Sequence, residues 1–186
     1  MAEEYLVIDG LEFTYKGLFS FGQFLNYIKR LFKSCGYEIV EKEKSAKIKS
    51  TGKDFYIEFL AQKPKTKYEI LTIILRINIQ NMINTVAIVD SKTRKLNQAD
   101  ITVTFDARLV TDLKERWTAP WYFFLKVLFK HGLGKMGERF EDELINDTHS
   151  IFENLKSYLN LHRFVEVKTK TKEKSKKAET NKRNSA

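Results

Sequence analysis

Residues Gly132 to Gly137 have the spacing Gly-x-Gly-x-x-Gly, which is the pattern in this chain most similar to a nucleotide-binding fingerprint. In a dinucleotide site, such glycines let the backbone approach a pyrophosphate at a helix N-terminus. That site also requires a second parallel strand after the helix, followed by an acidic ribose contact. Here the pattern stays helical after Gly137 and then becomes a lysine-rich tail. The glycines therefore predict a bend between two helical stretches rather than a cofactor site.

Side chains that commonly bind metals or act as nucleophiles are few and scattered. The three histidines, His131, His149 and His162, do not have metal-ligand spacing, and Cys35 has no histidine nearby in the sequence. The acidic residues of 138–147 lie mostly off the apolar stripe of a predicted helix, which indicates a solvated face. We expect no metal, no cofactor and no catalytic residue, and the sequence favours a binding protein over an enzyme.

The segment 117–129, WTAPWYFFLKVLF, holds six aromatic residues and a single charge, Lys126. A surface helix normally keeps one polar face, whereas this segment is apolar nearly all round. It must therefore be covered on more than one side, by the protein's own sheet, a ligand, a protein partner or a membrane surface. We take Trp117, Trp121 and Phe124 as its candidate contact residues.

The C-terminal tail, residues 166–186, carries eight Lys/Arg and three Glu, a net charge of +5 out of +9 for the whole chain. Residues 168–186 contain no Val, Leu, Ile or aromatic residue, so we expect them to be disordered. A basic tail attracts polyanions, which suggests weak nucleic-acid contact, although it also fits a solubilising tail without a dedicated partner. The candidate polyanion contacts are Lys168, Lys170, Lys172, Lys174, Lys176 and Lys177.

The remainder, residues 1–165, has the size and composition of one globular domain: the chain has 186 residues, of which 42% are hydrophobic and 31% charged. No apolar run approaches the roughly 20 residues of a spanning helix, so we expect no transmembrane segment. The N-terminus lacks the apolar core of a secretory signal, and the single cysteine rules out an internal disulfide. These features predict a cytoplasmic protein.

Apolar and polar residues alternate in several segments, which is typical of strands with one buried face. The pattern predicts about six strands, at 5–16, 37–43, 55–60, 68–80, 85–89 and 101–110. Short polar turns between successive strands indicate an antiparallel meander. One helix interrupts the order early, over residues 20–35, with Ser20 and Gln23 forming a capping-box pattern and Gly36 as its stop.

The C-terminal part is helical in pattern, first over the aromatic segment and then from Glu138 to about His162. Forty straight helical residues would span about 60 Å, whereas a domain of this size is about 40 Å across. We therefore predict a break or sharp kink between Gly132 and Gly137. The second stretch has an apolar stripe that includes Phe140, Leu144 and Phe152.

A strand, a helix, an antiparallel meander and a long C-terminal helix form an order that resembles the helix-grip superfamily of START and Bet v 1-like proteins. The fold class that we predict is α+β, with a curved antiparallel meander packed against a long kinked C-terminal helix and one short N-terminal helix. The resemblance implies an apolar cavity between sheet and helix, and a hydrophobic or lipid-like ligand. Rings from the two elements would line it: Phe55, Phe59, Phe105, Phe140 and Phe152.

The leading hypothesis from the sequence is thus a non-enzymatic binding module for a hydrophobic small molecule or a protein partner, with the segment 117–129 as contact or lid. Two alternatives stay open. The charge of +9 suits a nucleic-acid- or ribosome-associated protein. The Trp, Phe and Lys residues of 117–129 suit a peripheral binder of membrane surfaces.

Overall fold

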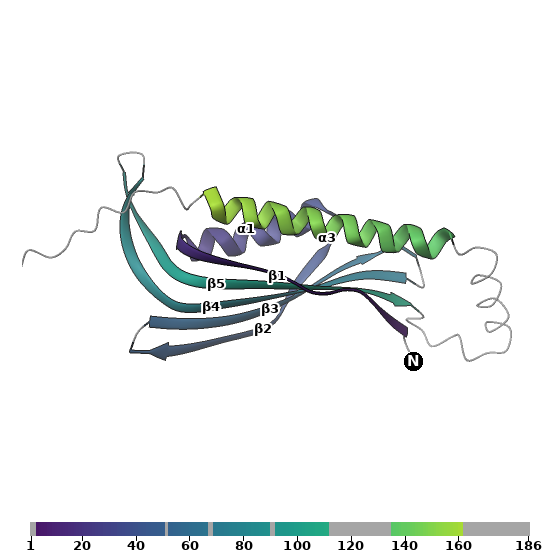
Figure 1. Cartoon of the computed structure of the whole chain (residues 1–186), viewed down its shortest axis with the longest axis horizontal. Helices are drawn as coiled ribbons and strands as arrows, with labels where there is room; N and C mark the ends of the chain where they lie inside the picture. Colours follow the sequence, from purple (N-terminus) through teal and green to yellow (C-terminus); the bar gives the residue numbers. More distant parts are fainter. Residues whose placement is uncertain (1–2, 51, 67–68, 90–91, 112–134, 162–186) are drawn as a thin grey trace, which may run out of the picture.

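The structure is a computed structural model that describes residues 3–50, 52–66, 69–89, 92–111 and 135–161. Its elements run β1 (Glu3–Phe19), α1 (Phe21–Ser34), β2 (Glu38–Lys49), β3 (Gly52–Pro64), β4 (Glu69–Val89), β5 (Lys92–Thr111) and α3 (Lys135–Leu161). The predicted α+β class is confirmed. The strands form one antiparallel sheet in the order β1-β5-β4-β3-β2. Figure 1 shows that the sheet is curved and that both helices lie on one side of it.

The alternation of apolar residues sets which face of the sheet is buried. In β5, the residues predicted to face the core are all buried: Ile101, Val103, Phe105, Ala107 and Leu109. In β4 the same holds for Leu71, Ile73, Leu75, Ile77 and Ile79. The residues between them lie on the other face and are mainly polar. Because side chains alternate across a strand, this pattern commits one whole face of the sheet to the helices.

The described residues contain five strands, so the prediction of about six was wrong at one place. Residues 85–89, predicted as a separate strand, are the last part of β4. A register shift between Gln80 and Ile83 lets the strand continue past its polar stretch. Asn81 has a positive φ of 53° there, and its backbone N–H donates to Asp54 at 2.9 Å. The bulge thus absorbs an irregularity that resembled a strand end in the sequence.

Helix α1 begins after Ser20 and ends before Gly36, as the sequence predicted. The hydrogen bond at its N-terminus, however, has a different acceptor from the one predicted. The Ser20 side chain makes no capping hydrogen bond. The backbone N–H of Phe21 donates instead to the side-chain oxygen of Asn97 on β5, at 3.1 Å. At the other end Gly36 takes the left-handed conformation, with a φ of 81°. The capping box was therefore a wrong prediction and the glycine stop a correct one.

Helix α3 starts at Lys135 and includes Gly137, so its start was predicted three residues too late. The break was predicted between Gly132 and Gly137: Lys135 to Gly137 belong to α3, and residues 132–134 lie outside the described residues. From Lys135 onward, α3 runs along the sheet beside α1 (Figure 1). Its apolar stripe is buried as predicted at Leu144, Ile151, Leu155 and Leu159.

The Phe152 ring joins α3 to the sheet. Its centroid lies 5.2 Å from that of Phe13 on β1, at an interplanar angle of 87°, and 5.8 Å from that of Phe105 on β5, at 65°. Such edge-to-face contacts add about 1 kcal/mol each to the burial of the rings. Phe152 is 8% exposed, whereas Phe140, about three turns earlier on α3, is only half-buried.

This difference in burial makes a prediction for stability. We expect Phe152→Ala to lower the free energy of unfolding by about 3–5 kcal/mol, the usual cost of removing a core phenylalanine. Phe140→Ala, a change of the same chemistry on the same helix, should cost clearly less. Urea unfolding followed by circular dichroism measures both. Equal losses would contradict the assignment of Phe152 as the ring that anchors α3.

Candidate functional site

Polar side chains converge at two places beside the helices. The first, the Lys63 cluster, consists of Tyr37, Lys63, Lys65, Glu143 and Asp147. The second, the α1–α3 cleft, is lined by Gln23, Asn26, Lys29, Arg30 and Tyr158. Both join α3 to elements far away in the sequence, and both are therefore candidate sites.

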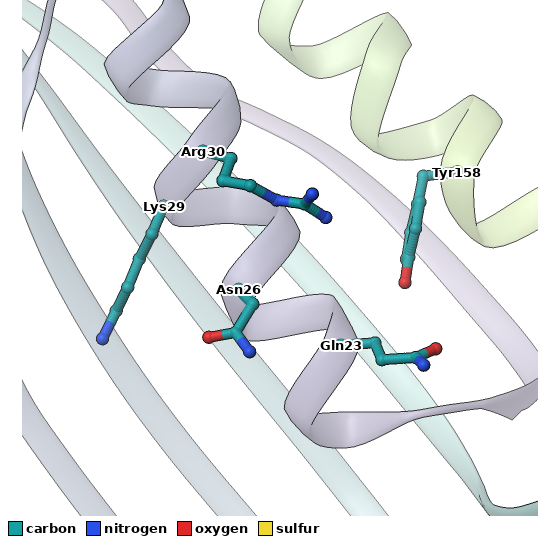
Figure 2. A pocket seen from close by; sticks show the side chains of 5 residues that line it. All are labelled: Gln23, Asn26, Lys29, Arg30 and Tyr158. Atoms are coloured by element: carbon teal, nitrogen blue, oxygen red, sulfur yellow. The ribbon is translucent and has the colours of Figure 1, made fainter.

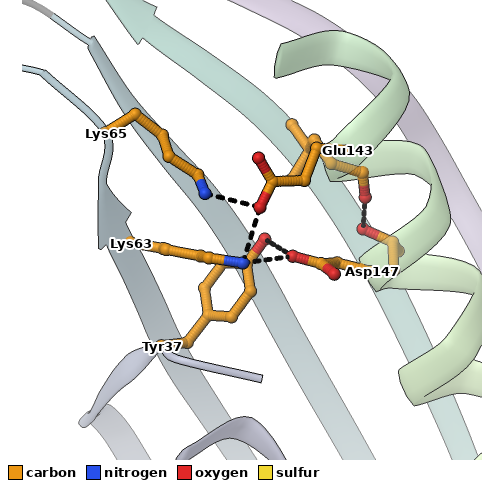
Figure 3. Close-up of polar contacts among 7 residues, drawn as sticks. Tyr37, Lys63, Lys65, Glu143 and Asp147 are labelled. Carbon is orange, nitrogen blue, oxygen red and sulfur yellow. Dashed lines mark hydrogen bonds and ion pairs between the residues drawn. The ribbon is translucent and has the colours of Figure 1, made fainter. Parts of the chain in front are cut away.

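The Lys63 cluster ties α3 to the end of β3 (Figure 3). The Lys63 ammonium donates to Glu143 and to Asp147, at 2.8 Å in each case. Lys65 donates to the same Glu143 oxygen, and the Tyr37 hydroxyl donates to Asp147 at 3.1 Å. Two ammonium groups thus face two carboxylates, and the cluster is electrically balanced.

The protonation states of the cluster are fixed by these contacts. Burial alone would lower the pKa of Lys63, but hydrogen bonds to Asp147 and Glu143 outweigh it and raise that pKa above its ordinary value. Burial, with the Asp147 carboxylate, raises the pKa of Tyr37. A lysine that acts as a nucleophile or base needs a lowered pKa. The cluster therefore has the electrostatics of a structural clamp and not of a catalytic centre.

Several cations on the sheet are also paired with acids. On the face away from the helices, Arg76 pairs with Asp106, which is 3% exposed and also accepts the Gly10 N–H at 3.0 Å. The Gly10 bond falls where β1 shifts register against β5. Carboxylates also form ion pairs with further cations on β1, β2 and β5: Lys16–Asp100, Lys42–Glu58, Lys44–Glu41, Lys49–Asp54 and Arg108–Glu4. The carboxylates compete with any outside anion for these cations.

Helix α1 differs from this pattern. Its exposed face carries Lys29, Arg30 and Lys33, and residues 21–34 include no acid. None of these three cations forms an ion pair or a side-chain hydrogen bond in the ranges that the structure describes. The buried face of the helix, with Phe24, Ile28 and Phe32, holds it on the core. The local charge of α1 is therefore exposed and not neutralised by neighbours.

The α1–α3 cleft opens beside this face and has a volume of about 740 Å³. Figure 2 shows Arg30 and Gln23 reaching from α1 toward Tyr158 on α3. The Tyr158 ring stacks on Tyr27, with centroids 4.2 Å apart and planes 12° apart. Burial raises the pKa of Tyr158, although the Arg30 charge opposes the shift. Its hydroxyl stays protonated near neutral pH, and none of the described residues that line the cleft is a carboxylate.

The residues predicted as an apolar site are placed differently. Trp117, Trp121 and Phe124 lie outside the described residues, as do Lys168, Lys170, Lys172, Lys174, Lys176 and Lys177. Phe105 and Phe152 contact each other in the core, and Phe140 packs at its border. The described candidate rings, Phe105, Phe140 and Phe152, thus do not line the cleft at α1, whose described lining consists of other residues.

The residues of the α1–α3 cleft were not singled out from the sequence as a site. Gln23 was considered as part of the capping box, and Asn26, Lys29 and Arg30 fall on the polar positions of the predicted helix. A sequence signal did exist, because a four-turn helix with three cations and no acid is unusual among the mixed charges of this chain. The contribution of Tyr158 had no such signal, since it depends on how α3 lies beside α1.

Comparison with protein-family models, with curated proteins and with solved structures finds no match to this chain. Its function is therefore inferred from geometry and charge. Within the described ranges, no helix is long and apolar enough to cross a membrane. Those ranges also contain no group of three His, Cys, Asp or Glu side chains that could hold a metal ion.

The Lys63 cluster predicts a specific dependence of stability on pH. Burial alone would raise the pKa of Glu143, but hydrogen bonds from Lys63 and Lys65 prevail and hold it below its ordinary value of 4.5. A depressed pKa stabilises the fold above the unfolded-state value, and this contribution is lost as the pH falls through the folded-state value. Glu143→Gln should therefore cost about 1 kcal/mol near pH 7. The difference from the unaltered chain should shrink once the pH falls below about 4.5.

Chemical unfolding at a series of pH values measures this difference. Glu153→Gln is the matched control, because Glu153 lies on the same helix with an exposed partner, Lys156, at 3.9 Å. It should change stability little at any pH. A cost of Glu143→Gln that stays constant down to about pH 3 would show that the carboxylate charge does not hold the clamp together.

Proposed function

We propose that this chain is a non-enzymatic binding protein for nucleic acid, and that the exposed basic face of α1 is its folded contact surface. The observation that carries this proposal is that Lys29, Arg30 and Lys33 lie together on α1 and have no acidic partner among the described residues. Cations whose charge is not neutralised by the protein attract phosphates and release the counterions of the nucleic acid on binding.

The position of the end of α3 and the composition of the C-terminal tail support the same surface. Tyr158 lies in the α1–α3 cleft, and α3 ends three residues later at Leu161. Three helical residues correspond to about 4.5 Å. The chain thus leaves α3 beside α1 before it enters residues 166–186, whose eight Lys/Arg outnumber three Glu. Residues 166–186 follow the end of α3 in the sequence, and their net positive charge adds to the attraction of the chain for a polyanion.

The architecture is compatible with the helix-grip type, which we propose as the class of this fold. A curved antiparallel sheet and a long C-terminal helix along it, as in Figure 1, support the proposal. The kink before the last helix remains a prediction. An apolar ligand is less well supported than nucleic acid, because the rings of Phe13, Phe105 and Phe152 pack against one another where α3 meets the sheet.

Both expectations for the segment 117–129 stay predictions, since it lies outside the described residues. A protein partner or a membrane surface would contact Trp117 or Trp121. No contact in the described ranges favours either over nucleic acid.

The basic face of α1 makes a prediction for binding. In the full chain, Lys29→Gln combined with Lys33→Gln should weaken binding of an oligonucleotide. It should also reduce the slope of log K against log salt by about 1.4, or about 0.7 for each single-strand phosphate that the protein no longer neutralises. Fluorescence anisotropy at several salt concentrations measures affinity and slope together.

The control is Lys42→Gln combined with Lys44→Gln on β2. These lysines are equally numerous and lie on the surface, but they pair with Glu58 and Glu41. The total charge changes by the same amount in both double variants. If both reduce the slope equally, net charge and not the α1 face controls binding, and the proposed surface is wrong.

The tail makes a separate prediction. In the full chain, Lys→Gln changes at all six candidate tail lysines should lower the affinity for the oligonucleotide at low salt. The loss of affinity should be smaller at high salt, since exposed charges are screened there. The same anisotropy titration measures it. Unchanged affinity at low salt would remove the tail from the proposed surface.

A further inference from the structure

We infer that the α1–α3 cleft takes one nucleotide of a single strand, with its base against the tyrosine wall and its phosphate at the basic edge of α1. This inference rests on the proposed function and specifies its ligand. It is carried by a combination found at this cleft: an aromatic wall, amide side chains and cations whose charges are not paired.

The wall consists of Tyr158 and the rings that hold it. The Tyr158 ring is inclined by 12° to that of Tyr27, with the two centroids 4.2 Å apart. It is inclined by 19° to the ring of Phe24, whose centroid is 6.2 Å away. Phe24 is fully buried, which anchors this stack on the core. Tyr158 is thereby held in a fixed orientation while it still lines the cleft. A base can extend such a stack at little entropic cost, because the platform is already ordered.

The opposite side of the cleft supplies polar groups suited to a nucleotide. Gln23, which reaches toward Tyr158 in Figure 2, carries a primary amide that can both donate to and accept from the edge of a base. Asn26 carries a second amide, which points to the same side of α1 as Lys29. Arg30 reaches toward Tyr158, and its guanidinium can form bidentate hydrogen bonds with phosphates. Lys29 extends away from Tyr158 in Figure 2, along the outer side of α1. A strand could therefore enter the cleft at one nucleotide and continue along α1 by phosphate contacts.

The size and charge of the cleft agree with this ligand. A volume of about 740 Å³ lies within the range of small-molecule sites and exceeds the needs of one nucleotide. None of the five lining residues is acidic, so a phosphate meets no nearby repulsion from the cleft itself. An apolar ligand fits less well, because four of the five lining side chains are amides or cations.

The arrangement distinguishes single strands from duplexes. In a duplex the faces of the bases are stacked on each other and are not accessible to a protein ring. Stacking on Tyr158 therefore contributes only to single-strand binding, whereas the cations of α1 attract the phosphates of either form. The contribution from the ring should also depend less on salt.

The experiment compares a fluorescent single-stranded oligonucleotide with a blunt duplex of the same sequence, in both DNA and RNA, on the full chain. Tyr158→Leu should weaken single-strand binding by about tenfold or more, the effect of losing one stacked base. Duplex binding should change by less than about twofold. Tyr158→Phe keeps the ring and should bind nearly as the unaltered chain does. Tyr5→Leu, at a 59% exposed tyrosine on β1, is the control for loss of a surface ring.

A second measurement avoids any change to the stack. An oligonucleotide with a photoreactive thymine analogue is cross-linked to the unaltered chain, and the adduct is mapped by mass spectrometry. Attachment to Tyr158, or to the α1 residues that line the cleft, supports the inference even if Tyr158→Leu disturbs folding. Attachment only elsewhere overturns it.

The outcomes separate the inference from the proposed function. If neither single strands nor duplexes bind the unaltered chain, the proposed function itself fails. If both bind and Tyr158→Leu weakens them equally or not at all, with circular dichroism unchanged, the nucleic-acid function stands and the cleft is not a base site. If free mononucleotide competes as well as the oligonucleotide at equal nucleotide concentration, the cleft binds a nucleotide but does not recognise a strand, which overturns the single-strand assignment.

Discussion

The burial of the apolar stripe of α3 against one face of the sheet is the constraint on which the other features of this structure depend. Leu144, Ile151 and Leu155 are fully buried, and Phe152 contacts rings from β1 and β5. This packing fixes the rotation of α3 about its own axis, because a helix has only one stripe that can face the core. Once the rotation is fixed, Glu143 must meet the end of β3 at one side, and Tyr158 must meet α1 at the other.

The two polar regions along α3 are therefore consequences of one packing arrangement, but they differ in electrostatics. At the Lys63 cluster, cations and carboxylates are matched, and hydrogen bonds fix the charged forms of Lys63 and Glu143. At the α1–α3 cleft the cations Lys29 and Arg30 lie among amides and a phenol. A balanced cluster gains little from an outside anion, since binding would break existing pairs. At a surface whose cations are not paired, an anion breaks no existing ion pair, so its binding is opposed only by the cost of desolvation.

Local periodicity predicted the parts of this fold that depend on neighbours in the sequence. The alternation in β5 and the stripe of α3 required only a count of apolar positions, and Gly36 required only the preference of glycine for positive φ. Contacts between distant residues were beyond that method. Asn97 replaces Ser20 at the N-terminus of α1, and the bulge at Asn81 joins two predicted strands into β4. Tyr158 became a candidate only through its place beside Tyr27.

The cleft and the tail would act over different distances, and this determines how they can cooperate. Charges in the tail would attract a nucleic acid across about 8 Å of physiological salt solution, but they would not select its structure. Stacking on Tyr158 acts only in contact, and it requires a base that is already free of its partner. Because α3 ends three residues after Tyr158, a strand bound by the residues that follow would be at a high effective concentration near the cleft. In the proposed binding mode, selection for single strands would reside in the folded domain, while the tail would mainly set how fast and how often a strand arrives.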